Sequence, residues 1–268
     1  MRYIPQKVFN VLIVMVMLVV GFEAVAEETR VGLLLAHLAF DEQTGDVAAD
    51  ASPSGNDGKL SGGPRWTAGR IGGALEFDGV DDFVELPSTP DLDGLQNGSF
   101  TVSAWFKPAD VPPVRGPGDA GHYGIVNKAG WHTGLRYNDD RTFTFDYWLR
   151  SENPTEPRWS GAATGDETFA PGRWYHVAGV VDASARTATI FIDGVAKGTS
   201  PAWDAGSRAR DYGSVTWKIG TAAPGSKAYA YPSKGVIDDV RIYGRALPAA
   251  EITDLAKAGG AARGAERP

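Results

Sequence analysis

Cysteine is absent from all 268 residues of the chain, which excludes disulfide bridges and every thiol-based mechanism. Long basic runs are absent too. The formal net charge of −7 is spread along the whole chain, so we expect no nucleic-acid partner. The chain also lacks the Gly-x-Ser-x-Gly motif of serine hydrolases and the His-Glu-x-x-His motif of zinc hydrolases. A chain of this composition must be held together by its hydrophobic core, with or without a metal ion.

One stretch is hydrophobic enough to be a signal peptide or a membrane anchor. Residues 8–22 are apolar, Arg2 and Lys7 precede them, and the Ala-Val-Ala triplet at residues 24–26 supplies the small-x-small pattern of a signal-peptidase site. The stretch is shorter than the ~20 residues that a bilayer-spanning helix needs, which favours a signal peptide over a membrane anchor. The sequence therefore predicts a signal peptide over residues 1–26 and a secreted protein, extracellular or periplasmic, without a membrane span after cleavage.

The rest of the chain has the residue pattern of an all-β protein. Short apolar runs alternate with Asp-Gly, Asn-Gly and Pro-Gly pairs, and helical spacing is scarce until the end. A short C-terminal helix is predicted to begin at Pro248 and to end at Gly259. The strands that the pattern predicts are residues 73–78, 83–86, 100–107, 142–149, 174–181, 188–193 and 236–243.

Many short strands joined by turn residues favour a sandwich or a barrel, and two packed sheets are the usual way to bury alternating faces. Two stretches, residues 108–121 and 151–172, are rich in proline, glycine and polar residues and are expected to be long loops, where function tends to lie. No internal repeat or long linker divides the chain. We therefore expect one domain over residues 30–258 and a disordered tail over residues 259–268.

A series of short motifs, taken in order, resembles one known family. Each motif alone is common in β proteins, but the series resembles the laminin-G-like, concanavalin-A-like lectin/glucanase family over nearly the whole mature chain. The motifs are His37-Leu-Ala-Phe-Asp-Glu, Gly72-Gly-Ala-Leu-Glu-Phe-Asp-Gly-Val-Asp-Asp-Phe-Val, Phe100-Thr-Val-Ser-Ala-Trp-Phe, Trp174-Tyr-His-Val-Ala, Ile190-Phe-Ile-Asp-Gly, Trp217-Lys-Ile-Gly and Gly235-Val-Ile-Asp-Asp-Val-Arg-Ile-Tyr.

The resemblance implies an all-β, two-sheet antiparallel jelly-roll sandwich, here with one short C-terminal helix. In many relatives the concave side of one sheet and the rim loops bind ligands. The family includes lectins, adhesion modules, enzyme appendages and enzymes, so the fold alone does not give the function.

Paired carboxylates of the kind that hydrolyse glycosidic bonds are missing. Glycoside hydrolases of this architecture usually carry Glu-x-Asp-x-x-Glu on one strand, so that acidic groups reach both sides of the bond. The predicted strand at residues 142–149 carries only Asp146, and Glu152 lies beyond it. We therefore expect Asp146 to be structural and the protein not to be an enzyme. A glycoside hydrolase or lyase with an unrecognised carboxylate pair is the alternative.

Aromatic residues are the clearest sign of a ligand, because eight tryptophans are many for this length. Those in loop-like surroundings can expose a ring face that stacks on sugar rings, while nearby polar groups bond the hydroxyls. Trp131, Tyr137 and Trp159, near the predicted strand at residues 142–149, are the predicted ligand-binding residues. The competing interpretation is that these rings hold the long loops against the sandwich.

Asp238 indicates a metal site in the last predicted strand. In residues 236–243, strand alternation places Asp238 on the same face as Val236, Val240 and Ile242, where it interrupts an apolar surface. A buried carboxylate is costly unless it is paired or hydrogen-bonded. A hard cation with oxygen ligands is one solution, and bonding to backbone N–H groups or to an arginine is the other.

The family resemblance implies which ligands would surround that cation. It implies a structural calcium ion held by Asp238, by backbone oxygen within residues 39–41, and by backbone oxygen of Gly73. Asp41 could add a side-chain oxygen or could instead cap the turn that follows it. Such a site would join the two ends of the chain and would act on stability rather than on chemistry.

These observations predict a secreted, non-catalytic binding module with a structural calcium ion. Its ligand would be a carbohydrate, or another extracellular-matrix or cell-surface ligand such as an extracellular protein. A structural or adhesion protein of the surface is a further alternative, and it would present an apolar or edge-strand contact patch in place of an aromatic groove.

Overall fold

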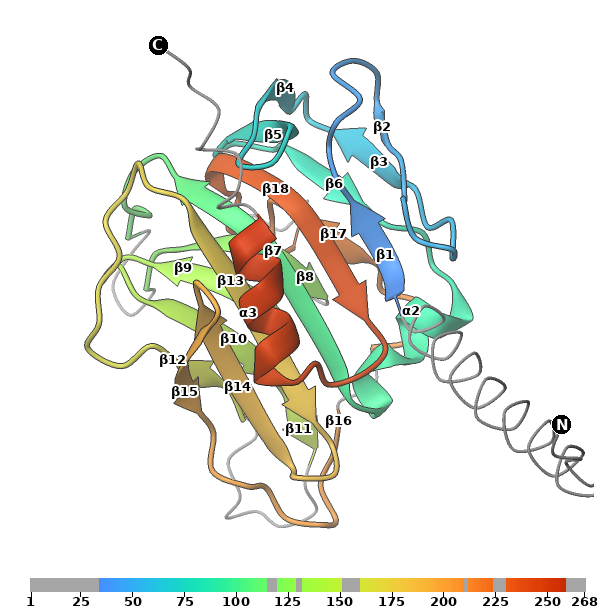
Figure 1. The fold of residues 1–268 in the computed structure, drawn as a ribbon, viewed down its shortest axis with the longest axis vertical. Coiled ribbons are helices and arrows are strands. Elements are labelled where there is room, and N and C mark those ends of the chain that lie inside the picture. The colour runs from blue at the N-terminus through green and yellow to red at the C-terminus, as the bar shows by residue number, and fades with distance from the viewer. Residues whose placement is uncertain are drawn as a thin grey trace, which may run out of the picture.

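The computed structural model describes residues 34–114, 120–128, 132–150, 160–209, 212–223 and 230–258. These residues form mostly strands, arranged in two antiparallel sheets (Figure 1). The sandwich that the sequence predicts is therefore confirmed. The expected signal peptide and the expected tail both lie outside the described residues. Within the described part of the chain, no helix is long and apolar enough to cross a membrane.

The first sheet has the strand order β15-β14-β13-β7-β18-β5-β4. On the side of β18 opposite β7, β5 pairs with the first half of β18 and β1 pairs with its second half. The strands of this sheet are β1 (Leu34–Leu38), β4 (Arg65–Ala68), β5 (Gly73–Asp78), β7 (Phe100–Pro108), β13 (Tyr175–Asp182), β14 (Thr187–Ile192), β15 (Val195–Thr199) and β18 (Lys234–Tyr243).

The second sheet has the order β12-β10-β9-β8-β17-β6-β3-β2. Its strands are β2 (Val47–Ala48), β3 (Gly58–Ser61), β6 (Phe83–Glu85), β8 (His122–Lys128), β9 (Thr133–Asn138), β10 (Phe143–Tyr147), β12 (Ala162–Ala163) and β17 (Trp217–Ile219). The remaining elements are the pair β11 (Leu149–Arg150) and β16 (Arg208–Ala209), the helices α2 (Pro90–Gly94) and α3 (Ala249–Ala258), and the 3-10 turn η1 (Leu95–Asn97).

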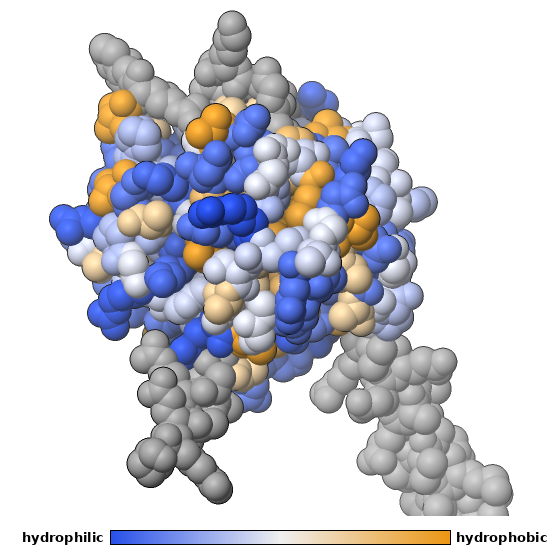
Figure 2. All heavy atoms as spheres, turned by 90° about the horizontal axis from the view of Figure 1, so that it is seen from above, coloured by the Kyte–Doolittle hydropathy of each residue, from blue (hydrophilic) through white to orange (hydrophobic). Residues whose placement is uncertain are grey.

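The surface of the sandwich is mixed in polarity. Seen from the end at the top of Figure 1, apolar residues are scattered among polar ones and do not gather in one patch (Figure 2). The large apolar side chains that the described surface exposes also come from separate segments: Val47, Val80, Val111, Val114, Val195 and Val215.

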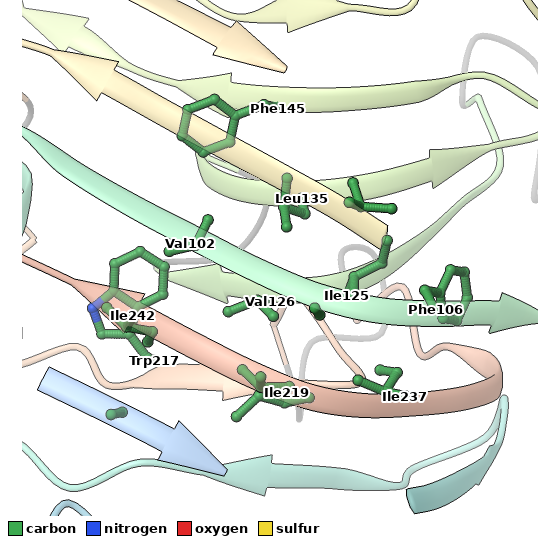
Figure 3. Packing of buried hydrophobic residues seen from close by; sticks show 14 of the residues in the cluster. Val102, Phe106, Ile125, Val126, Leu135, Phe145, Trp217, Ile219, Ile237 and Ile242 are labelled. Carbon is green, nitrogen blue, oxygen red and sulfur yellow. The ribbon is translucent and has the colours of Figure 1, made fainter. Parts of the chain in front are cut away.

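Alternate strand residues point between the two sheets and form the main core. Val102 and Phe106 of the first sheet lie among Leu135 and Phe145 of the second, and all four are fully buried (Figure 3). Phe100 makes edge-to-face contacts with Phe145, Tyr147 and Trp217. Burying each large apolar side chain contributes roughly 1.5–3 kcal/mol, so this layer supplies the stability that disulfides cannot.

The predicted C-terminal helix is confirmed as α3, which covers part of the outer face of the first sheet (Figure 1). Ile252 of α3 is fully buried in a second, smaller cluster with Phe191 and Tyr243. Arg245 forms an ion pair of 2.6 Å with Glu251 in the first turn of the helix.

A β-bulge interrupts β18 and changes which of its residues face the core. Asp238 lies opposite Trp105 of β7, but the next partners along β18 are Arg241 and Ser103, so one extra residue sits in β18. Asp239 takes the left-handed conformation that this requires, with φ of 47°.

The expected alternation of β18 is therefore wrong. Ile237 and Val240 both face the core, whereas Val236 does not. Asp238 lies at the bulge and does not interrupt an apolar face.

Candidate functional site

Three segments from distant parts of the chain meet at one end of the sandwich. They are residues 39–43, which follow β1, the turn at residues 69–72 between β4 and β5, and Asp238 at the bulge of β18. They meet because β1 and β5 both pair with β18. The predicted metal ligands Asp41, Gly73 and Asp238 are therefore neighbours in the fold.

The carboxylate of Asp238 is fully buried. Its Oδ2 accepts hydrogen bonds from the backbone N–H groups of Arg70 at 2.7 Å and Ile71 at 2.8 Å. Its Oδ1 is buried and has no partner of ordinary hydrogen-bond geometry among the described residues. Burial raises the pKa of Asp238 to about 7, although the two N–H donors act in the opposite direction. One oxygen of a costly buried group is thus left open for a further interaction.

Glycines leave room for oxygen atoms around this carboxylate. A Cβ on Gly69 would lie 2.0 Å from the carbonyl oxygen of Gly73 and 2.6 Å from Oδ2 of Asp238. A Cβ on Gly73 would lie 2.3 Å from the carbonyl oxygen of Phe40. Real side chains do not tolerate such distances, so backbone oxygens occupy the space that side chains would fill. We call Gly69, Gly73, Phe40 and Asp238 the oxygen cradle.

Asp41 shapes the segment beside the oxygen cradle. It is exposed, and its Oδ1 accepts a hydrogen bond of 2.6 Å from the backbone N–H of Gly73. The preceding Phe40 has a φ of 56°, which is unusual for a residue with a bulky side chain. The contact ties this segment to the first residue of β5, 32 positions away, and is not a bond to the turn that follows Asp41.

The oxygen cradle has the chemistry of a hard-cation site. It combines one buried carboxylate oxygen without a partner and two backbone carbonyl oxygens, and calcium is typically bound by such oxygens. The backbone bonds to Oδ2 are the competing interpretation that the sequence left open, but they satisfy only one of the two carboxylate oxygens. These residues offer oxygen atoms of the kind that calcium binds, three of the roughly six to eight that it takes.

An open cleft adjoins the oxygen cradle. Its volume is about 610 Å³, and its lining includes Phe40, Asp41, Gln43, Trp66, Thr67 and Gly73. The indole of Trp66 packs edge-on against Phe40, with ring centroids 6.5 Å apart, and its Nε1–H donates to the carbonyl of Gly45 at 3.0 Å. We call this space the Trp66 cleft.

Sequence reasoning overlooked Trp66, although the signal was present. The residues before it are Gly62, Gly63 and Pro64, which is the loop-like surrounding that singled out the other aromatic candidates.

The three aromatic residues predicted to bind a ligand have different outcomes. Tyr137 is fully buried in the core, and its hydroxyl donates to the carbonyl of Phe169 at 2.7 Å. Its ring packs against Phe106 and Phe143 and offers no face to a ligand, so the prediction for Tyr137 is wrong. It points inward because it lies two residues after the core residue Leu135 in β9. Trp131 and Trp159 lie outside the described residues, and their role stays a prediction.

Asp146 is engaged in an ion pair. Its carboxylate is fully buried and contacts the guanidinium of Arg136 on the neighbouring strand β9, at 2.9 Å for Oδ1 and 2.5 Å for Oδ2. Both carboxylate oxygens face the cation. The geometry is that of a cross-strand pair within the second sheet.

An acidic cluster lies at the β5–β6 turn, where the side-chain oxygens of Asp78, Asp81 and Asp82 come within 4.8 Å of one another. Asp82 Oδ2 accepts the backbone N–H of Asp78, and Asp78 Oδ1 accepts that of Val80. Burial raises the pKa of Asp82. These bonds are those of a tight turn.

Comparison with known proteins places the chain in a broad group. The profile of the concanavalin A-like lectin/glucanases superfamily matches residues 78–253. No curated protein sequence matches the chain.

Several solved structures share the fold. The binding domain of Paraclostridial Mosquitocidal Protein 1 superposes with a TM-score of 0.63 at 14% identity, over 85% of this chain and 52% of that one. Domain 4 of AbnA, an extracellular arabinanase of Geobacillus stearothermophilus, in complex with arabinotriose, superposes with a TM-score of 0.56 at 21% identity, over 84% of this chain and 98% of that one.

A sialidase of Trypanosoma rangeli superposes with a TM-score of 0.55 at 21% identity, over 84% of this chain and 32% of the sialidase chain. The chain thus spans about half of the mosquitocidal protein structure and about a third of the sialidase. At these identities the similarity shows the fold alone.

Proposed function

The chain belongs to the concanavalin A-like lectin/glucanase superfamily, and from that premise we propose that it is a secreted, non-catalytic module that binds a carbohydrate and holds one structural calcium ion. The observation that carries the proposal is the Trp66 cleft, where a partly exposed indole stands beside a carboxylate and an amide side chain. Aromatic faces and polar side chains placed together are the usual composition of a sugar-binding site.

Calcium is supported by the unpartnered Oδ1 of Asp238. The residues that would hold the ion are Asp238 through its carboxylate and Phe40 and Gly73 through their carbonyl oxygens. When bound, calcium would supply positive charge that offsets the buried carboxylate. Because Phe40 follows the first strand and Asp238 lies in the last, the oxygen cradle joins the two ends of the domain.

A non-catalytic role is supported by the ion pair between Asp146 and Arg136. On the strand where hydrolases of this architecture carry their carboxylates, this chain has one acid, and that acid is ion-paired with Arg136. Both oxygens of this acid contact the guanidinium and the side chain is buried, so the carboxylate is engaged within the sheet.

Carbohydrate as the ligand class is supported by a structural neighbour. Domain 4 of the arabinanase was solved with arabinotriose, so one sandwich of this topology does hold a sugar. The apolar residues scattered over the face shown in Figure 2 give less support to an adhesion role that needs a large apolar patch.

The test is binding of the exported protein to a glycan array, followed by calorimetric titration of the saccharides that bind, with calcium and with chelator. Saccharide binding without release of reducing sugar from the same saccharides would support the proposal. Binding to no saccharide in either condition would refute carbohydrate binding, and release of reducing sugar would refute the non-catalytic assignment.

A further inference from the structure

The Trp66 cleft has a fixed shape. Phe40 and Gln43, which line it, both have left-handed backbone conformations, with φ of 56° and 66°. The segment that carries them is tied to the first residue of β5 by the bond from the Gly73 N–H to Asp41. On the opposite wall, Trp66 is fixed by its bond to the carbonyl of Gly45. A preformed cleft loses little entropy when a ligand binds.

The polar groups at the Trp66 cleft are suited to hydroxyl groups. Asp41 uses Oδ1 for the Gly73 N–H, which leaves Oδ2 as a hydrogen-bond acceptor. The side chains of Gln43 and Thr67 form no hydrogen bond with other described residues, so an amide donor, an amide acceptor and a hydroxyl are available. Together with the indole of Trp66, they match the alternation of apolar faces and hydroxyls on a sugar ring.

The charged side chain that lines the Trp66 cleft is acidic. Asp41 lines it, and Glu42 and Asp46 lie in the same segment. The nearby cation, Arg70, is directed elsewhere, because its guanidinium lies over the ring of Trp105 at 5.0 Å. Arg65, next to Trp66 in β4, is paired with Glu76 at 2.9 Å. An anionic ligand would therefore meet the carboxylate of Asp41, and the described residues that line the cleft include no cation to offset it.

We infer that the Trp66 cleft binds neutral saccharides and discriminates against acidic ones, with Trp66 as the stacking platform, Gln43 and Thr67 as hydroxyl partners, and Asp41 as the residue that sets the charge preference. This rests on the proposed carbohydrate-binding function and assigns its site and ligand class.

The experiment measures dissociation constants of the exported protein for neutral xylo-, cello- and arabino-oligosaccharides and for oligogalacturonate of the same length. Two variants remove contacts: Trp66→Leu removes the ring face, and Gln43→Gly removes the amide while tolerating the positive φ. Each should weaken binding of the preferred neutral saccharide by about tenfold or more, which corresponds to about 1.4 kcal/mol.

Two further variants separate the site from general damage. Trp203→Leu makes the same change at another tryptophan that is partly buried against the core, and it should leave the dissociation constant unchanged. Asp41→Asn keeps the Oδ1 acceptor for Gly73 but removes the charge, and it should narrow the preference for neutral over acidic saccharides.

The outcomes are distinct. If the wild type binds neutral saccharides and both Trp66→Leu and Gln43→Gly bind as well as it does, the site is elsewhere and the inference is overturned. Preference of the wild type for oligogalacturonate overturns the charge argument. If the wild type binds none of the saccharides, the proposed function itself fails, and the variants are not needed to show it.

Discussion

The carboxylate of Asp238 accepts a hydrogen bond of 2.8 Å from the backbone N–H of Ile71, although the two residues are 167 positions apart in the sequence. Asp238 therefore fixes the turn between β4 and β5 against the last strand. This turn leads into β5 and so places the carbonyl of Gly73 in the oxygen cradle. A single carboxylate thus organises a turn, and its second oxygen is left for a ligand.

The Asp238→Asn substitution tests the calcium ion. Calcium that binds only the folded protein raises its stability with concentration, by about 2.7 kcal/mol at a free concentration one hundred times the dissociation constant. The wild type should therefore unfold at higher temperature in calcium than in chelator. Asp238→Asn should lose most of this difference, because an amide is a weaker ligand than a carboxylate. The unfolding temperatures are measured by scanning calorimetry. If they are the same in calcium and in chelator for both proteins, the site is refuted.

The Gly69→Ala substitution tests the geometry of the oxygen cradle. The new methyl group would lie 2.0 Å from the carbonyl oxygen of Gly73, so the turn must move, at a cost of about 1–3 kcal/mol in the free energy of unfolding. Calcium binding should weaken as well. Gly206→Ala is the matched control, because a Cβ there meets no atom within 4 Å. Equal denaturation midpoints in urea for the two variants would contradict the structure at this turn.

Strands with regular alternation could be predicted closely from the sequence. The prediction for residues 73–78 coincides with β5, and that for residues 100–107 differs from β7 by one residue. The turn pairs Asp78-Gly79 and Asp193-Gly194 mark where β5 and β14 end, because glycine adopts the positive φ that the turn needs. Local chemistry decides these boundaries, so a single sequence reveals them.

Other features depend on partners that the sequence does not display. The bulge at Asp238 is defined by the register of β18 against Trp105 and Ser103 of β7. The residue types of β18 alone do not predict it. Tyr137 follows Gly134 in a segment that reads as a loop, yet β9 pairs on both sides and turns its ring inward. Asp238 was singled out by the expected strand parity, and Asp41 and Gly73 by the family resemblance. The proximity of the three depends on strand order, which local pattern leaves open.

Cleavage after Ala26 is predicted from the small-x-small triplet that follows the apolar run. Mass spectrometry of the exported protein should find a mature chain that begins at Glu27. An exported product that retains residues 1–26 would contradict the signal peptide and, with it, the secreted location.

Trp131 and Trp159 remain predicted ligand-binding residues outside the described part of the chain. If their rings stack on sugar, Trp131→Ala and Trp159→Ala should each weaken saccharide binding in calorimetric titrations. If they hold loops against the sandwich, the substitutions should lower the unfolding temperature and leave the dissociation constant unchanged. The two readouts together distinguish a ligand contact from a structural one.

His176 is a buried group whose charge state should affect stability in acid. It lies on β13, 1% exposed, with its ring edge-on to Trp105 at 5.4 Å. Burial lowers the pKa of His176 to about 4; the carboxylate of Asp239 opposes this shift, and the guanidinium of Arg241 adds to it. Its ring therefore stays neutral in the folded protein at pH values where an exposed histidine is charged.

The sign of the effect follows from proton binding. Between the unfolded pKa of 6.5 and the folded pKa of about 4, the unfolded chain binds a proton at His176 that the folded chain does not. The free energy of unfolding therefore has its full value above pH 6.5 and decreases as the pH falls toward 4. The decrease due to His176 is about 3 kcal/mol. His176→Gln, which cannot titrate, should flatten this limb in urea denaturation curves collected between pH 4 and 7. An unchanged acid limb in the variant would show that other groups control acid unfolding.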